Sequence, residues 1–211
     1  MKMQPIFITG TDTDVGKTFI SALLVKRWGA DYWKPVQTGL NEDIGDTATV
    51  TQMLQASGGI PSNTIIFDPA LKYQNPLSPW RCTILENKEE IDITKLNLPP
   101  TTNTIIVEGA GGVLVPFTKD KFTTDVIHHL NTPVILIARS KLGTLNHTLL
   151  SLEVMKARGN NVVGVILNGE IDDDNLKALE ALGARIIAQI PHTSKIEDVL
   201  HLIPPLEEVL Q

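Results

Sequence analysis

The chain has 211 residues, of which 42% are hydrophobic and 20% charged, so it can bury one core and is too short for several domains. We therefore expect a single domain over residues 1–211. The formal net charge of -6 at pH 7 leaves no overall basic surface, and nucleic acid is not expected as a partner. We find neither a secretory leader nor an apolar run near the roughly 20 residues that span a bilayer, and expect a cytoplasmic protein without membrane contact.

At the amino-terminal end, a predicted strand leads through a glycine-rich loop into a predicted helix. Residues 5–9 (PIFIT) form an apolar run typical of a strand buried on both faces. The segment GTDTDVGKT, from Gly10 to Thr18, comes next, and residues 17–28 have helical spacing. Five residues separate the two glycines of this segment, where the familiar phosphate-loop pattern has four.

This strand, loop and helix favour a widened phosphate loop over an ordinary glycine-rich turn. Glycines let backbone N–H groups face phosphate oxygens, and a helix N-terminus adds positive potential. Lys17 supplies a positive charge and the Thr18 hydroxyl can ligate Mg²⁺. The additional residue widens the loop, so polar groups of residues 11–14 can face a second substrate as well as the nucleotide.

The next cationic candidate is Lys34, in YWKPVQTG at the end of a short apolar strand. A lysine between Trp33 and Pro35 is poorly explained as a solubilising surface charge. If it lies near the loop, it can neutralise charge on a transferring phosphoryl group or on the anion that attacks it. The residues alone leave this role and that of an ordinary strand-end lysine equally open.

Two carboxylates are candidate Mg²⁺ ligands beside Thr18. Glu108 directly follows an apolar run and precedes GAGG, at the carboxyl end of a presumed central strand. Ligands bind at such strand ends in open α/β sheets, which favours this role over the capping of a turn. Asp46 begins the helical pattern of residues 46–56, where it can be an N-cap, a ligand or both.

The remaining elements alternate between strand and helix. Residues 58–100 mix Pro, Asn and Ser with aromatic residues and predict a loop-and-helix excursion too short for its own core. The single cysteine, Cys82, is interpreted as a packing residue. Central parallel strands are predicted at 104–109, 133–138, 162–168 and 185–191, and helices at 122–130, 145–157 and 174–182. The predicted fold class is α/β: a parallel β-sheet flanked by helices, P-loop NTPase-like.

The acidic and histidine clusters are not expected to bind metal. Residues 172–174 are three consecutive aspartates, which suit the solvated first turn of a helix. His128 and His129 are expected at the surface or in packing, and His147 in a helix near an interface.

Four motifs in register resemble the dethiobiotin synthetases, ATP-dependent carboxylases of biotin biosynthesis. They are GTDTDVGKT, KPVQTG, EGAGG and SKLGTLNH (residues 140–147), and the resemblance extends from the N-terminus to about Pro191. It implies closure of a cyclic urea on 7,8-diaminononanoate (7,8-diaminopelargonate) with CO2 and MgATP. A carbamate and a carbamic-phosphoric anhydride are the implied intermediates.

The resemblance also implies roles for individual residues. The implied catalytic residues are Thr13, Lys17 and Lys34, and the implied Mg²⁺ ligands are Thr18, Asp46 and Glu108. The implied ATP-binding residues are Asp14, Val15, Gly16, Lys17, Thr18, Phe19, Asp46, Glu108, Gly109, Ala110, Gly111, Asn168, Gly169, Pro191, His192 and Thr193. The implied substrate-binding residues are Thr13, Lys34, Thr38, Gly143, Thr144, Leu145 and Asn146.

In this family pattern the substrate carboxylate lies at a helix N-terminus of the neighbouring subunit, so a homodimer with sites at its interface is implied. Residues 143–146, with free backbone N–H groups, would form that N-terminus. Asn168 would contact adenine, although a turn residue at a strand end is the alternative.

The sequence departs from the family pattern at three places. Asp14 stands where many members carry Glu, and Thr38 where they often carry Ser. SPWRCT (residues 78–83) replaces a Pro followed by small residues, so Trp80 and Arg81 either alter the diamine pocket or pack at its edge.

Two other classes of protein fit the sequence less well. Nucleotide-switch ATPases that position plasmids or division sites carry an early loop lysine, where this chain has Thr11 and Asp12. Cobyrinate-amidating ligases need a glutaminase domain for which this chain is too short.

Overall fold

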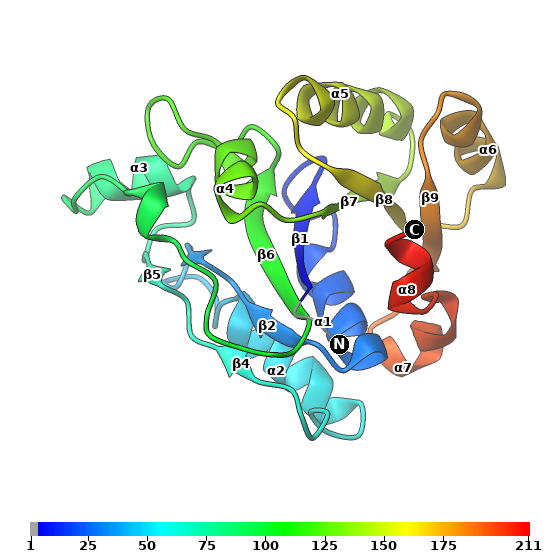
Figure 1. The fold of residues 1–211 in the computed structure, drawn as a ribbon, viewed down its shortest axis with the longest axis horizontal. Helices are drawn as coiled ribbons and strands as arrows, with labels where there is room; N and C mark the ends of the chain where they lie inside the picture. The colour runs from blue at the N-terminus through cyan, green and yellow to red at the C-terminus, as the bar shows by residue number, and fades with distance from the viewer. Residues whose placement is uncertain (1–3) are drawn as a thin grey trace.

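The computed structural model describes residues 4–211, in which a seven-stranded parallel sheet lies between two layers of helices (Figure 1). The strand order is β4-β2-β6-β1-β7-β8-β9. These strands are β1 (Pro5–Gly10), β2 (Asp31–Trp33), β4 (Ile66–Phe67), β6 (Ile105–Gly112), β7 (Val134–Ser140), β8 (Val162–Gly169) and β9 (Ile186–Pro191). A separate parallel pair is formed by β3 (Val36–Gln37) and β5 (Leu71–Lys72).

Each face of the sheet is covered by its own set of helices (Figure 1). One face packs against α1 (Lys17–Trp28), α2 (Asp46–Ala56), α7 (Ile196–Val199) and α8 (Leu206–Val209). The other packs against α3 (Pro79–Leu85), α4 (Thr123–Leu130), α5 (Thr144–Ala157) and α6 (Asp173–Ala181). Two 3-10 turns, η1 (Ile93–Lys95) and η2 (Leu200–Leu202), complete the elements. The predicted α/β class with a parallel sheet is confirmed.

The apolar runs are continuous because the central strands are buried on both sides. In β1, Ile6 and Ile8 belong to the core under α1, whereas Phe7 between them belongs to the core on the opposite face. All three side chains are fully buried. Because successive side chains of a strand point to opposite faces, apolar side chains of β1 lie in both cores. This explains why apolar and polar residues do not alternate in this strand.

Two predictions about the sheet were wrong. The run at 185–191 was expected to be a central strand, but β9 is the edge strand, and of its side chains only Ile190 is fully buried. The excursion of residues 58–100 was predicted as loop and helix, but it also contains β4, which forms the opposite edge of the sheet and pairs with β2. Two residues, Ile66 and Phe67, are too short a run to show a strand by periodicity.

Strand register brings three chemically important segments together at the carboxyl edge. Ile8 on β1 lies opposite Glu108 on β6. Trp33 on β2 lies opposite Val107 on β6, so Lys34 follows its strand one position later, beside Glu108. The phosphate loop, which leaves β1 after Gly10, therefore begins at the same edge.

No helix within residues 4–211 is long and apolar enough to cross a membrane. The expected domain of residues 1–211 includes three residues at its start that lie outside the described residues.

Candidate functional site

Hydrogen bonds of Asp12 with Lys17 and Thr13 stabilise the loop between β1 and α1. The Lys17 ammonium donates to the Asp12 carbonyl at 3.0 Å, and the Thr13 N–H donates to Asp12 Oδ1 at 2.7 Å. Asp14 has φ of 55°, a conformation that Asp and Asn adopt more readily than Glu. The Asp at this departure from the family pattern therefore suits the local backbone.

Gly16, the residue before α1, cannot carry a side chain. Its φ is 91°, and a Cβ there would lie 2.0 Å from the Asn168 amide nitrogen. That nitrogen donates to the Val15 carbonyl at 3.0 Å and so ties the end of β8 to the loop. Phe19 and Val15 pack on the core below, which anchors the start of α1.

Three oxygen-bearing side chains from different elements converge at the start of α1. The Thr18 hydroxyl donates to Asp46 Oδ1 at 2.6 Å and lies 3.0 Å from Glu108 Oε1. Hydroxyl and carboxylate oxygens are the ligands that Mg²⁺ takes beside phosphates. The donor set and its convergence therefore fit a magnesium site.

The sequence left open whether Asp46 is the N-cap of a helix, and the structure shows that it is not. The N-cap of α2 is Gly45, and Asp46 is the first helical residue. Its backbone N–H donates to Gln37 Oε1 at 2.9 Å, which leaves its carboxylate directed to Thr18 and Lys34.

Lys34 joins the two carboxylates and is not a surface lysine. It is 4% exposed, and its ammonium lies 2.8 Å from Asp46 Oδ2 and 3.4 Å from Glu108 Oε1. It also donates to the Gly109 carbonyl at 3.0 Å. The structure therefore meets the condition set for the phosphoryl role, that Lys34 lies near the phosphate loop, since it lines the same cavity as Lys17 and Thr18.

The charges of this cluster shift one another's pKa values. Burial lowers the pKa of Lys34, but the Glu108 and Asp46 carboxylates outweigh it and raise the value. Burial raises the pKa of Asp46, but Lys34 outweighs it and lowers the value. The pKa of Lys17 is lowered by burial and then by the neighbouring Lys34 charge. Lys34 is therefore held as a cation and Asp46 as an anion.

Two further residues of the cluster were missed by the sequence reasoning. Gln37 holds the start of α2 through Asp46, and the buried Tyr32 hydroxyl donates to Glu108 Oε2 at 3.0 Å. Burial, followed by the charge of Glu108, raises the pKa of Tyr32 well above its usual value, so the hydroxyl keeps its proton. The available signal was the spacing: Tyr32 lies two residues before Lys34 in the same segment.

These side chains surround a cavity of about 330 Å³. It includes the predicted catalytic, metal and loop residues together with Thr38 and the end of β6, so the structure brings these predicted residues together. The lining residues are Thr13, Asp14, Gly16, Lys17, Thr18, Lys34, Gln37, Thr38, Asp43, Asp46, Glu108, Ala110 and Gly111.

Comparison with known proteins gives the family. A family model described as an AAA domain matches residues 4–199. The ATP-dependent dethiobiotin synthetase BioD of Lawsonia intracellularis is 41% identical over 207 residues, covering 97% of this chain and 97% of that protein. The one from Paramagnetospirillum magneticum is 42% identical over 189 residues, covering 89% and 88%.

The chain belongs to the ATP-dependent dethiobiotin synthetase family. It is therefore an ATP-dependent enzyme of biotin biosynthesis, as the four motifs predicted. The biotin biosynthesis bifunctional protein BioCD of Bordetella avium is also similar, with 48% identity over 197 residues. The match covers 93% of this chain and 41% of that longer protein.

Solved structures with a similar fold are much more distant in sequence. The septum site-determining protein MinD of Pyrococcus horikoshii, complexed with Mg-ADP, has a TM-score of 0.55 at 18% identity, covering 97% of this chain and 87% of that one. The cell division ATPase MinD of Pyrococcus furiosus has a TM-score of 0.54 at 16% identity, covering 95% and 89%. At this identity the likeness shows the P-loop ATPase fold alone.

Some of the residues predicted to contact the base line a second cavity beside the loop. Asn168, Gly169 and His192 line it together with Asp14 and Val15, and its volume is about 310 Å³. Pro191 ends β9 opposite Gly169. Thr193 does not line this cavity, and its hydroxyl lies 3.4 Å from Asp198 Oδ2.

The predicted carboxylate-binding segment of this dethiobiotin synthetase lies outside both cavities. Gly143 is the N-cap of α5, and Thr144 lines a separate cavity of about 200 Å³. The expectation that all N–H groups of residues 143–146 are free was wrong, because the Thr144 N–H donates to the Lys141 carbonyl at 3.0 Å. The turn formed by residues 141–144 uses that group. Leu145 and Asn146 follow within the first turn of α5.

Arg139 is a further contact that the sequence reasoning missed. It lies near the end of β7, and its guanidinium donates to Asp12 Oδ2 at 2.7 Å. The loop is thereby joined to the strand that leads to residues 143–146.

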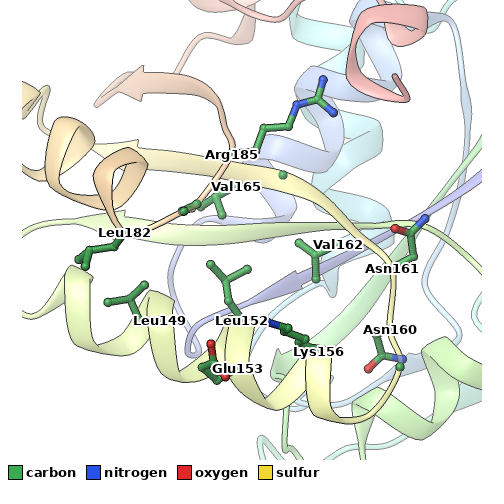
Figure 2. Close-up of a pocket in the computed structure, with 14 residues that line it drawn as sticks. Leu149, Leu152, Glu153, Lys156, Asn160, Asn161, Val162, Val165, Leu182 and Arg185 are labelled. Atoms are coloured by element: carbon green, nitrogen blue, oxygen red, sulfur yellow. The ribbon is translucent and has the colours of Figure 1, made fainter.

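A larger cavity of about 620 Å³ lies elsewhere, between α5, β8 and the turn after α6 (Figure 2). Figure 2 shows Leu149 and Leu152 rising from α5 toward the strands. None of the predicted site residues lines it. The phosphate loop, the start of α1 and the opposed charges of Lys34, Asp46 and Glu108 meet instead at the cavity of about 330 Å³.

Trp80 and Arg81, in the segment 78–83 that departs from the family pattern, do not line the cavity of about 330 Å³. Trp80 and Arg81 lie on α3, with Trp80 half-buried and Arg81 exposed. Cys82 beside them is fully buried, as predicted for a packing residue. Burial raises the pKa of its thiol.

Proposed function

We propose that this chain closes the ureido ring of dethiobiotin on 7,8-diaminononanoate, with CO2 and MgATP, and releases ADP and phosphate. The single observation that carries the proposal is the convergence of two lysines with Thr18, Asp46 and Glu108 beside a widened phosphate loop. The reaction needs this pattern because each of its intermediates is an anion.

The chemistry has three bond-forming steps. One amine of the substrate attacks CO2 and loses a proton to give a carbamate. A carbamate oxygen attacks the γ-phosphorus of ATP, and the bond to ADP breaks, giving a carbamic-phosphoric anhydride. The second amine attacks the carbonyl carbon and loses a proton, and phosphate leaves with the electron pair of the broken C–O bond. No enzyme nucleophile is required.

Lys17 and Lys34 are proposed to stabilise the carbamate and the transferring phosphoryl group. Lys34 is suited to this role because its ammonium is buried, charged and already oriented by Asp46 and Glu108. A fixed charge in a site from which water is excluded stabilises a developing anion without reorganisation. Mg²⁺ held by Thr18, Asp46 and Glu108 would neutralise charge on the phosphate oxygens.

The widened loop is proposed to serve both substrates. Thr13 and Thr38 line the same cavity as Lys17 and Lys34. Their hydroxyls can bond to the diamine and the carbamate while the loop amides hold the phosphates. The residues proposed to surround the base are Asn168, Gly169, Pro191, His192 and Thr193. Asn168 already donates one amide N–H to the Val15 carbonyl, which leaves its carbonyl oxygen and second N–H for adenine.

The substrate carboxylate is proposed to bind at the α5 N-terminus of a second copy, through residues 143–146, in a homodimer. An exposed apolar side chain beside this N-terminus supports an interface: Leu142, two residues before α5, is 99% exposed. We also propose that residues 1–211 act as one domain, supported by the single main sheet. The reaction is proposed to take place in the cytoplasm, where ATP is available.

The proposal is tested by mass spectrometry of the purified protein with 7,8-diaminononanoate, bicarbonate and MgATP. The expected product has gained one carbonyl and lost two hydrogens, and it disappears when any component is omitted. Lys34→Ala should abolish the product but keep ATP binding, whereas Lys72→Ala, an exposed lysine paired with Asp68, should leave it unchanged. ATP hydrolysis without this product would show that the acceptor is a different molecule.

A further inference from the structure

Tyr32 is a large polar aromatic residue in a part of the core whose other buried members are aliphatic. It is the middle residue of β2 and is fully buried. It pairs with Ile106 on β6, so both side chains point to the face covered by α1. Glu108 is two residues beyond Ile106 and therefore points to this same face.

The two oxygens of the Glu108 carboxylate have different partners. Oε1 faces the cluster, with the Thr18 hydroxyl at 3.0 Å and the Lys34 ammonium at 3.4 Å. Oε2 accepts the Tyr32 hydroxyl at 3.0 Å. Among the residues that the structure describes, Tyr32 is the one hydrogen-bond donor to Oε2.

Burial strengthens the effect of the hydrogen bond between the Tyr32 hydroxyl and Glu108 Oε2 on the orientation of the carboxylate. Glu108 is 1% exposed, so water cannot substitute for a lost partner. A hydroxyl that donates to a buried carboxylate forms a charge-assisted bond, stronger than one between neutral groups. The bond therefore fixes the rotation of the carboxylate, and with it the direction in which Oε1 points.

We propose that Tyr32 is a positioning residue, which orients Glu108 so that Oε1 is presented to the metal and phosphates. This inference rests on the proposed function, in which Glu108 is a magnesium ligand. Tyr32 itself touches neither substrate nor metal and acts through the carboxylate. Partners of metal ligands of this kind typically change metal affinity or activity by about 10- to 100-fold when they are removed.

The test compares Tyr32→Phe with Tyr73→Phe, a second buried tyrosine that does not line the cavity of about 330 Å³. Two quantities are measured: the Mg²⁺ concentration for half-maximal turnover, and Mn²⁺ binding in the presence of ADP by electron paramagnetic resonance. Tyr32→Phe should raise both the half-maximal Mg²⁺ concentration and the Mn²⁺ dissociation constant by about tenfold or more. At saturating Mg²⁺, its turnover should recover toward that of the unmodified protein. Tyr73→Phe should change neither quantity.

Glu108→Gln separates a failure of this inference from a failure of the proposed function. If Glu108→Gln weakens Mn²⁺ binding but Tyr32→Phe leaves both quantities unchanged, the positioning role is overturned and the metal role stands. If Glu108→Gln also leaves both unchanged, the metal role is overturned and the positioning role with it. Thermal melting checks folding, and Tyr32→Met, an apolar residue that adapts to irregular space, carries the same test if the Phe variant does not fold.

Discussion

Replacement of Lys34 by Met should destabilise the protein strongly, because it leaves two carboxylates without their shared cation. Met keeps most of the side-chain volume and removes the charge. At an effective dielectric constant of about 20, the attractions across 2.8 Å and 3.4 Å correspond to about 6 and about 5 kcal/mol before desolvation. Burial of the ammonium offsets much of this attraction, and breaking a buried ion pair typically costs about 3–5 kcal/mol in net terms.

Thermal melting in the presence of a metal chelator measures this effect. The expected decrease in Tm is roughly 6–20 °C, since 1 kcal/mol shifts the Tm of a protein of this size by about 2–4 °C. Lys72→Met is the control: its pair with Asp68 spans 3.6 Å between exposed side chains, so the change should be within about 1 kcal/mol. An unchanged Tm for Lys34→Met would refute the argument that the carboxylates depend on Lys34.

The pH of this assay follows from the direction of the pKa shifts. The pKa of Lys34 is raised above 10.5, so its stabilisation is fully present below pH 10.5 and is lost as the pH rises through the folded-state value. The pKa of Asp46 is lowered from 3.8, so its stabilisation is present above pH 3.8 and is lost as the pH falls through its folded-state value. A measurement near pH 7 therefore includes the stabilisation from both Lys34 and Asp46.

Three other substitutions test separate parts of the structure. Gly16→Ala should abolish nucleotide binding measured by calorimetry, because a Cβ at φ of 91° meets the Asn168 amide at 2.0 Å; retained binding would show that the loop can shift. Glu86→Gln should lower the urea midpoint at pH 7 with a deficit that shrinks as the pH falls. Burial raises the pKa of Glu86, but hydrogen bonds, led by that from the Asn75 backbone N–H, outweigh it and lower the pKa from 4.5 to about 2. The stabilisation from Glu86 is therefore present above pH 4.5 and is lost as the pH falls through about 2. A deficit that did not depend on pH would contradict this. Arg139→Gln should change the free energy of unfolding by less than about 1 kcal/mol, since the Asp12 pair is partly exposed; a larger loss in urea unfolding would mean that the loop depends on this pair.

The sequence was sufficient to predict the central strands and the phosphate loop, because burial on both faces and glycine spacing are local properties. It was insufficient for contacts that depend on strand order. β2 lies beside β6 although more than seventy positions separate Tyr32 from Glu108, and no local pattern shows such a pairing. Lys34 was a candidate because a charge between Trp33 and Pro35 was unusual. Its ion pairs, in contrast, follow from the register of two strands and from the start of α2.

The local periodicity also could not distinguish an edge strand from a central one. Apart from Arg185 and Gln189, residues 185–191 are apolar like the other runs, but no strand follows β9 to cover its far side within the described residues. Asp46 was ambiguous for a related reason. A carboxylate at a helix start is a common N-cap, and only the position of Gly45 and the contacts to Thr18 and Lys34 decide against that role.

The bond between Lys17 and the Asp12 carbonyl has a consequence for nucleotide affinity. A phosphate that takes up this ammonium must displace the carbonyl at 3.0 Å, so binding exchanges one acceptor for another. The net enthalpy is then smaller than the number of new contacts suggests. The long side chain is already ordered before the nucleotide arrives, however, so it loses less conformational freedom on binding. The loop thus exchanges part of the attraction for preorganisation.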